Sequence, residues 1–98
     1  MSLQYVGTAR PQNPQTASVS GTTATFTNPI GSGVRKFRLA ATIDVCFRQG
    51  KTPLTAVTTD TPVFASEPEY FSCMEGESVA VIARDGTSTG TAYLSEAV

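Results

Sequence analysis

The sequence contains no histidine and few charged residues for its length. Histidine is the commonest general base and metal ligand, so a Ser or Cys nucleophile in this chain would need another activator. The 98 residues carry seven basic and eight acidic side chains, which gives a formal net charge of −1. Such a balance supplies no bulk attraction to nucleic acid. We therefore predict no nucleic-acid partner, no catalytic site, and no bound metal or cofactor.

Long apolar runs and a leader-like N-terminus are also missing. No run approaches the length of a membrane span, so no membrane association is predicted. Residues 1–5 have neither a basic start nor an apolar stretch, so we expect no secretory segment. The two cysteines, Cys46 and Cys73, could form one disulfide or none. We predict free thiols, because nothing indicates an oxidising compartment.

The most informative stretch of the sequence is an unbroken alternation of apolar residues between Lys36 and Arg48. The apolar positions are Phe37, Leu39, Ala41, Ile43, Val45 and Phe47. Side chains alternate between the two faces of a strand, so this period of two places all six on one side. On a helix they would surround the whole circumference. We predict one long strand, with a bend or bulge at Ala40-Ala41 that lets its two ends pair with different neighbours.

Shorter extended segments occur along the rest of the chain. They cover residues 16–20, 23–27, 54–58, 63–65, 69–74, 78–83 and 89–94. Gly21-Thr22 and residues 84–87 have the chemistry of hairpin turns. Residues 78–83 are apolar in both phases, which is typical of a strand covered on two sides. No segment has a helical period with caps.

The predicted fold class is therefore all-β: a small antiparallel β-sandwich or jelly-roll-like barrel with an extended N-terminal arm. We assign residues 1–15 to the arm and residues 16–98 to a single β domain. The prolines and amides of residues 10–15 suit a core strand poorly. Leu3, Tyr5 and Val6 favour an arm that docks on a partner; a frayed terminus is the alternative.

Two groups of side chains are candidates for contact with a partner. Lys36, Arg38 and Arg48 would share one face of the long strand, either to discourage edge pairing or to pair with an acidic partner. Tyr and Phe residues outside the apolar row, Tyr93 included, can serve as core or interface residues. The predicted contact residues are Leu3, Tyr5, Val6, Arg10, Lys36, Arg38, Arg48, Phe64 and Tyr70.

Two further groups have a chemical and a structural interpretation. Arg48 could lower the pKa of the Cys46 thiol, but a lone Cys beside one Arg is usually inert. Glu67, Glu69, Glu75 and Glu77 could supply oxygen ligands to calcium, but Glu-Gly-Glu is ordinarily a solvated turn. We favour the structural interpretation for both groups, and no convergent catalytic set is present in the sequence.

From Phe37 onward, about two thirds of the chain resembles small proteins encoded among the head genes of tailed bacteriophages. The segments that carry the resemblance are Ile43-Asp44-Val45-Cys46-Phe47, Gly50, Thr52-Pro53-Leu54-Thr55-Ala56, Pro68-Glu69-Tyr70-Phe71, Gly76-Glu77-Ser78-Val79-Ala80-Val81-Ile82 and Gly90-Thr91-Ala92-Tyr93-Leu94. Proteins of this kind are similar to capsid cement or decoration proteins, which are small β domains on the outer head shell.

The resemblance implies a structural virion protein that is made in the host cytoplasm and located on the capsid surface. It would bind the major capsid protein, bridge neighbouring subunits and form a dimer or trimer, with no enzymatic step. Residues 1–15 would be a strap across a subunit boundary. The alternatives are a head-completion, tail or fibre-base module of the virion, or a host-directed binding protein.

Overall fold

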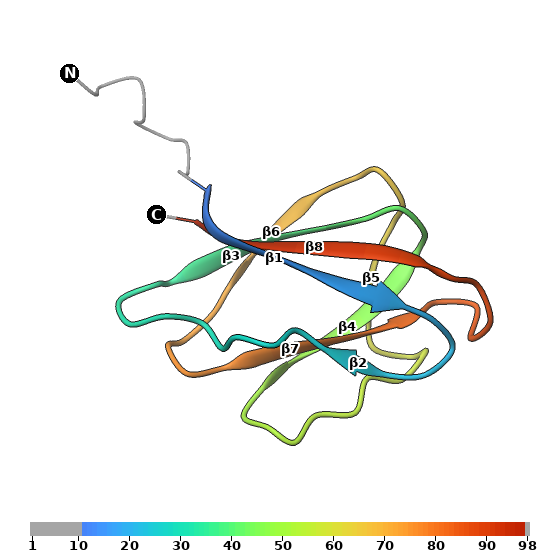
Figure 1. Ribbon diagram of the computed structural model, residues 1–98, viewed down its shortest axis with the longest axis horizontal. Helices are drawn as coiled ribbons and strands as arrows, with labels where there is room; N and C mark the ends of the chain where they lie inside the picture. The colour runs from blue at the N-terminus through green and yellow to red at the C-terminus, as the bar shows by residue number, and fades with distance from the viewer. Residues whose placement is uncertain (1–10, 98) are drawn as a thin grey trace.

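The computed structural model describes residues 11–97, which form two antiparallel four-stranded sheets packed face to face (Figure 1). The strands are β1 (Pro11–Val19), β2 (Ala24–Thr25), β3 (Lys36–Ala41), β4 (Val45–Gly50), β5 (Thr61–Val63), β6 (Glu69–Ser72), β7 (Ser78–Ala83) and β8 (Gly90–Ala97). Sheet A has the order β1-β8-β3-β6 and sheet B the order β2-β7-β4-β5. The predicted all-β sandwich is confirmed. No helix among residues 11–97 is long and apolar enough to cross a membrane.

The strand order follows a jelly-roll plan. The first strand pairs with the last, β2 with β7, β3 with β6 and β4 with β5, as in one long hairpin rolled into two layers. Among the described strands, only the β4–β5 connection therefore stays within one sheet. Every other connection carries the chain from one layer to the other.

The long strand predicted between Lys36 and Arg48 is two strands, and this part of the prediction was wrong. The chain leaves sheet A after Ala41 and enters sheet B at Val45, so the break lies just beyond the predicted bend at Ala40-Ala41. Its two halves do pair with different neighbours. The corner is held by backbone hydrogen bonds from Thr42 N–H to Thr91 O (2.9 Å) and from Arg84 N–H to Asp44 O (3.0 Å).

The predicted row of apolar residues nevertheless stays on the inner side across this corner. Its members Phe37, Leu39, Ala41, Val45 and Phe47 are buried in the main core, and Ile43 packs against that core. Two of their rings join Phe71 in an aromatic cluster with centroid distances of 4.5 to 6.0 Å. Burial of these large side chains is the main source of stability in a domain of this size.

Both predicted hairpins are absent, because their turns connect different sheets. Residues 20–23 link β1 to β2, and residues 84–89 link β7 to β8. The two turns lie against each other: a Cβ on Gly21 would lie 2.1 Å from the carbonyl oxygen of Gly86. No side chain fits at such a distance, so Gly21 is required by close approach of two backbones.

Residues 54–58 are not a strand either, but part of the long loop between β4 and β5. This loop covers the outer side of sheet B, where a second apolar cluster contains Cys46, Ala56, Ala80 and Ile82, with Leu54 packed against it. All six residues of β7 are buried as a result. The prediction that residues 78–83 are covered on two sides is confirmed.

At the N-terminal end, the structure places residues 11–15 within β1. This strand pairs with β8 along its whole length, with a register shift between Gln12 and Gln15. Residues 11–15, which the sequence suggested as the end of an arm, are therefore extended and paired with the domain. The predictions for Leu3, Tyr5, Val6 and Arg10 lie outside the described residues.

Candidate protein-contact surface

The outer face of sheet A has a group of exposed aromatic and basic side chains. Phe37 and Leu39 point into the core, so the alternate β3 residues Lys36 and Arg38 point outward. In the register of the sheet, Arg38 lies opposite Tyr70 of β6, and Ala40 lies opposite Tyr93 of β8. The side chains of Tyr70 and Tyr93 are 52% and 43% exposed. We call Lys36, Arg38, Tyr70 and Tyr93 the contact face.

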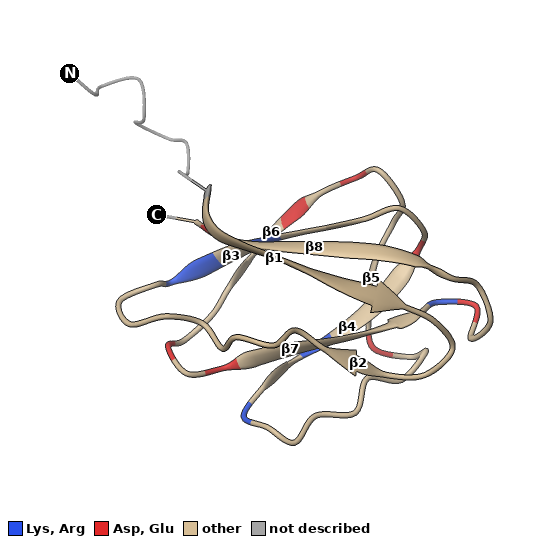
Figure 2. Ribbon diagram, viewed as in Figure 1, with Lys and Arg blue, Asp and Glu red and all other residues tan. Residues whose placement is uncertain are grey.

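The cations of the contact face have no acidic partner within the described residues. The single ion pair found between residues 11 and 97 joins Arg48 to Asp60, on the other sheet. Figure 2 shows the basic start of β3 at one end of sheet A. Tyr and Arg are enriched in protein interfaces because they combine an apolar body with hydrogen-bonding tips. The contact face is suited to binding a protein surface with carboxylates.

Arg48, predicted to share a face with Lys36 and Arg38, lies on the opposite side of the molecule. It also points away from the core, but from β4 in sheet B. Its Nη2 and Nε donate to Asp60 Oδ1 at 2.9 and 3.2 Å. Asp60 Oδ2 accepts the Val57 N–H at 2.8 Å. The hydrogen bond from Val57 and the neighbouring Arg48 lower the Asp60 pKa despite partial burial. Arg48 therefore helps to fix the β4–β5 loop.

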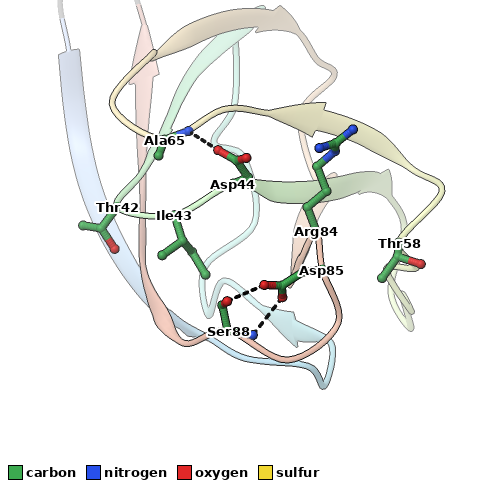
Figure 3. Close-up of a pocket in the computed structure, with 8 residues that line it drawn as sticks. All are labelled: Thr42, Ile43, Asp44, Thr58, Ala65, Arg84, Asp85 and Ser88. Carbon is green, nitrogen blue, oxygen red and sulfur yellow. Dashed lines mark hydrogen bonds between the residues drawn. The ribbon is translucent and has the colours of Figure 1, made fainter.

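An open hollow of about 550 Å³ lies at the corner between the two sheets (Figure 3). Phe64 precedes Ala65 and contacts Arg84, two residues of its lining. The Arg84 guanidinium lies over the Phe64 ring, 5.2 Å from the centroid, in a cation–π contact. The two acidic groups in the hollow serve the local backbone. Asp44 Oδ1 accepts the Ala65 N–H at 2.8 Å, and Asp85 accepts hydrogen bonds from its own turn.

In the turn after β7, Asp85 accepts hydrogen bonds from the residues that follow it. The Ser88 hydroxyl and N–H and the Thr87 N–H all donate to Asp85 and lower its pKa to about 2. Asp85 stabilises the turn through these hydrogen bonds. Because its carboxyl group is ionised at neutral pH, it is a poor proton donor. The hollow is therefore a structured loop junction, and its polar groups do not converge on a common point in Figure 3.

Glu96 is the one charged side chain among residues 11–97 that is fully buried, with 4% exposure. Its carboxylate accepts hydrogen bonds from Asn13 Nδ2 (2.7 Å), Gln12 Nε2 (3.3 Å) and the Gly31 N–H (2.8 Å). Burial raises its pKa, but the hydrogen bonds outweigh burial, so the net pKa is lowered. The ionised carboxylate thus joins β8 to the start of β1 and to the β2–β3 loop.

Asn13 reaches Glu96 because of the irregular backbone of β1. It has a φ of 50°, in the left-handed region that Asn tolerates better than most residues, at the register shift of the strand. A bulge of this kind re-aims a side chain without ending the strand. No property of the sequence around residues 12–13 indicated this contact, because its acceptor lies more than eighty positions away.

Both cysteines are buried free thiols, as predicted. Cys46 lies under the β4–β5 loop, with its Sγ 3.5 Å from Thr58 O. Burial raises the pKa of Cys46 above its ordinary value, and the nearby Arg84 only partly opposes this. Burial also raises the pKa of Cys73. Neither thiol has the lowered pKa that marks a reactive cysteine, so the interpretation of Cys46 as an inert thiol gains support.

The glutamates proposed as alternative calcium ligands are not gathered into a cluster. Among the described residues there is no group of three or more His, Cys, Asp or Glu side chains able to hold a metal ion. Glu75 accepts the Gly33 N–H at 3.1 Å, and Glu77 accepts the Met74 N–H at 2.8 Å. These two acids therefore stabilise loop backbone around the β6–β7 turn.

Of the predicted contact residues, the structure brings together Lys36, Arg38 and Tyr70. Arg48 and Phe64 lie elsewhere, on the outer side of sheet B and at the corner hollow. Tyr93 completes the contact face but was not among the predicted contacts. The sequence did contain an indication of this position. Tyr93 alternates with Ala92 and Leu94, so a strand that buries those two residues must point Tyr93 outward.

Comparison with protein-family models, with curated protein sequences and with solved structures finds no match.

Proposed function

We propose that this protein is a structural adhesion module that binds a protein surface through the contact face, without a chemical step. The observation that carries the proposal is the bare outer side of sheet A, where two half-exposed tyrosines flank an arginine with no acidic partner within residues 11–97. Aromatic and arginine side chains supply most of the binding energy of typical interfaces.

The partner we propose is the major capsid protein of a tailed bacteriophage, with this protein as cement or decoration on the outer head shell. The support for this step is the sequence resemblance of residues 37–94 to small head proteins, together with a jelly-roll plan that occurs in many viral capsid domains. Many weak copies bound to one shell act together, so a small interface per copy is sufficient. Binding that selects the assembled shell stabilises it by mass action.

The copy number on purified particles tests the partner. A cement protein is stoichiometric with the shell protein. A head-completion, tail or fibre-base module would be present in few copies, and a host-directed protein would be absent from particles. Quantitative mass spectrometry of purified particles distinguishes the three. Either of the last two results would overturn the proposed role on the shell.

A matched pair of substitutions tests the contact face itself. Arg38 and Arg48 are arginines on the outer sides of opposite sheets, so Arg38→Ala and Arg48→Ala remove the same side chain from the two faces. Loss of an arginine that is a hot spot of an interface weakens binding by about thirtyfold or more. We expect Arg38→Ala to lower by that factor the affinity for head shells that carry no bound copy of this protein. We expect Arg48→Ala to leave that affinity unchanged. Equal effects of the two would refute the assignment of the face.

A further inference from the structure

The exposed edges of the two sheets differ in how they are protected. The edge strands are β1 and β6 in sheet A, and β2 and β5 in sheet B. An unprotected edge exposes backbone N–H and C=O groups that can pair with another chain. β1 contains Pro14 and a register shift, β2 has only two residues, and β5 has Pro62 at its centre. β6, residues Glu69–Ser72, contains no proline, no lysine and no bulge.

The register of β6 identifies which of its backbone groups face outward. The Cys73 N–H donates to Arg35 O at 2.9 Å, so these two residues form a hydrogen-bonded pair across the ladder. Such pairs alternate along an antiparallel ladder. The N–H and C=O of Tyr70 and Ser72 therefore point to the free edge. Ser72 O also accepts Gln49 Nε2 at 2.8 Å, and its second lone pair stays available.

We propose that β6 pairs antiparallel with β6 of a second copy of this chain. In the register that matches the outward groups, Tyr70 lies opposite Ser72 of the second copy and exchanges two backbone hydrogen bonds with it. The two-fold symmetry repeats this pair on the other side of the axis. Sheet A of each copy would then continue into sheet A of the other.

The side chains along β6 suit this arrangement. Tyr70 would lie diagonally opposite Tyr70 of the second copy, at about 7–8 Å, a separation that aromatic side chains bridge. On the inner side, the partly exposed Phe71 would face its own equivalent. Met74, just beyond the strand and 71% exposed, would be partly covered. The pairing thus covers apolar groups that the single chain leaves in solvent.

The charges near the ends of β6 do not select the register. Glu67 and Glu69 lie at its start. Arg35 and Lys36, where β3 begins, lie beside its end, but Glu75 also follows that end. Antiparallel pairing would bring the acidic start of one copy toward both groups of the other, so the register is set by the outward backbone groups and by Tyr70.

This inference does not depend on the proposed capsid partner, because it concerns the isolated protein in solution. It would also place two contact faces side by side on one continuous sheet, which raises avidity for a repetitive surface. Only a short strand and its neighbours take part, so the interface is small and the dimer weak, with a dissociation constant of about 10–500 µM.

Sedimentation velocity of the purified full chain, from about 10 µM to 1 mM, tests the proposal. Ser72 and Ser18 are exposed, outward-facing serines on the two opposite edge strands of sheet A. Ser72→Lys puts a cation beside Lys36 and the incoming strand, whereas Ser18→Lys makes the same change on β1. We expect Ser72→Lys to weaken dimerisation by about thirtyfold and Ser18→Lys to leave it unchanged.

Ser72→Pro is the second variant, because it removes an outward N–H without removing a bond to β3. It deletes two hydrogen bonds from the symmetric dimer, so we again expect a loss of about thirtyfold. Circular dichroism melts establish that each variant is folded. A wild-type protein that stays monomeric to about 1 mM overturns the proposal. So does a dimer that persists in both folded Ser72 variants, or one that Ser18→Lys disrupts.

Discussion

The two sheets have the same number of strands, but only one of them has its outer side covered by a loop of the chain. Over sheet B, the β4–β5 loop packs Leu54 and Ala56 against Cys46 and Ile82. Over sheet A, no described segment forms a comparable apolar cluster, and Tyr70 and Tyr93 are about half exposed. The chain thus covers one outer side with its own loop and leaves the aromatic residues of the other exposed to solvent.

The difference follows from the composition of the central strands. β7 is apolar in both phases, so Ala80 and Ile82 on its outer side require a cover. The outer residues of β8 include Thr91, Tyr93 and Ser95, which tolerate water. An amphipathic outer side needs no cover for folding. It can therefore be reserved for a partner without a loss of stability in the free protein.

The strongest test of this comparison removes one large side chain from each outer side. Ile82→Ala leaves a cavity under the β4–β5 loop, so we expect the free energy of unfolding to fall by about 2–4 kcal/mol. Tyr93→Ala removes a half-exposed ring and should cost less than about 1 kcal/mol. Urea unfolding followed by circular dichroism measures both values.

The ratio of these two losses is the informative quantity. If Tyr93→Ala were as costly as Ile82→Ala, the outer side of sheet A would be part of the folded core. The distinction between a covered and a free side would then fail. Cys46→Ala is an internal check, because it removes a smaller buried group from the same cluster as Ile82 and should have an intermediate cost.

A second test concerns the buried carboxylate that links three segments at one end of sheet A. Glu96 joins β8 to the start of β1 and to the β2–β3 loop through three hydrogen bonds. Glu96→Gln removes the charge and replaces an acceptor by a donor that faces other donors. We expect a loss of about 1–3 kcal/mol at pH 7, measured by urea unfolding.

The pH dependence of this loss has a definite sign. The folded pKa of Glu96 is lowered, so its contribution is complete above the unfolded value of about 4.5 and is lost as the pH falls through the folded value. The difference between wild type and Glu96→Gln should therefore shrink between pH 5 and pH 3. A difference that is constant with pH would contradict the ionised role of Glu96.

These contrasts also show which features the sequence made predictable. The row from Phe37 to Phe47 was correctly assigned to the core, because a period of two fixes which side faces inward on either strand. Residues 78–83 were predicted to be covered on both sides because they are apolar in both phases, and all six are buried. Such predictions depend only on the local pattern, and the sheet to which a strand belongs does not affect them.

The arrangement of strands could not be predicted in this way. Gly21-Thr22 and Asp85-Gly86 have turn chemistry, but that chemistry specifies a reversal of the chain and not whether the next strand returns to the same sheet. The grouping of Arg48 with Lys36 and Arg38 failed for a related reason. All three point outward, but the crossing at residues 42–44 sends Arg48 to the other side of the sandwich.

The smallest expected changes in stability come from Asp60 and Arg48, which fix the β4–β5 loop over sheet B. Asp60 accepts hydrogen bonds from both the Val57 backbone and Arg48, and Arg48 is 46% exposed. An exposed ion pair contributes little, so Arg48→Ala and Asp60→Asn should each lower the free energy of unfolding by less than about 0.5 kcal/mol. Asparagine still offers an oxygen to the Val57 N–H. Asp60→Ala loses that acceptor as well and should cost about 1 kcal/mol. If urea unfolding gave the same loss for all three variants, the ion pair and not the backbone hydrogen bond would hold the loop over its sheet.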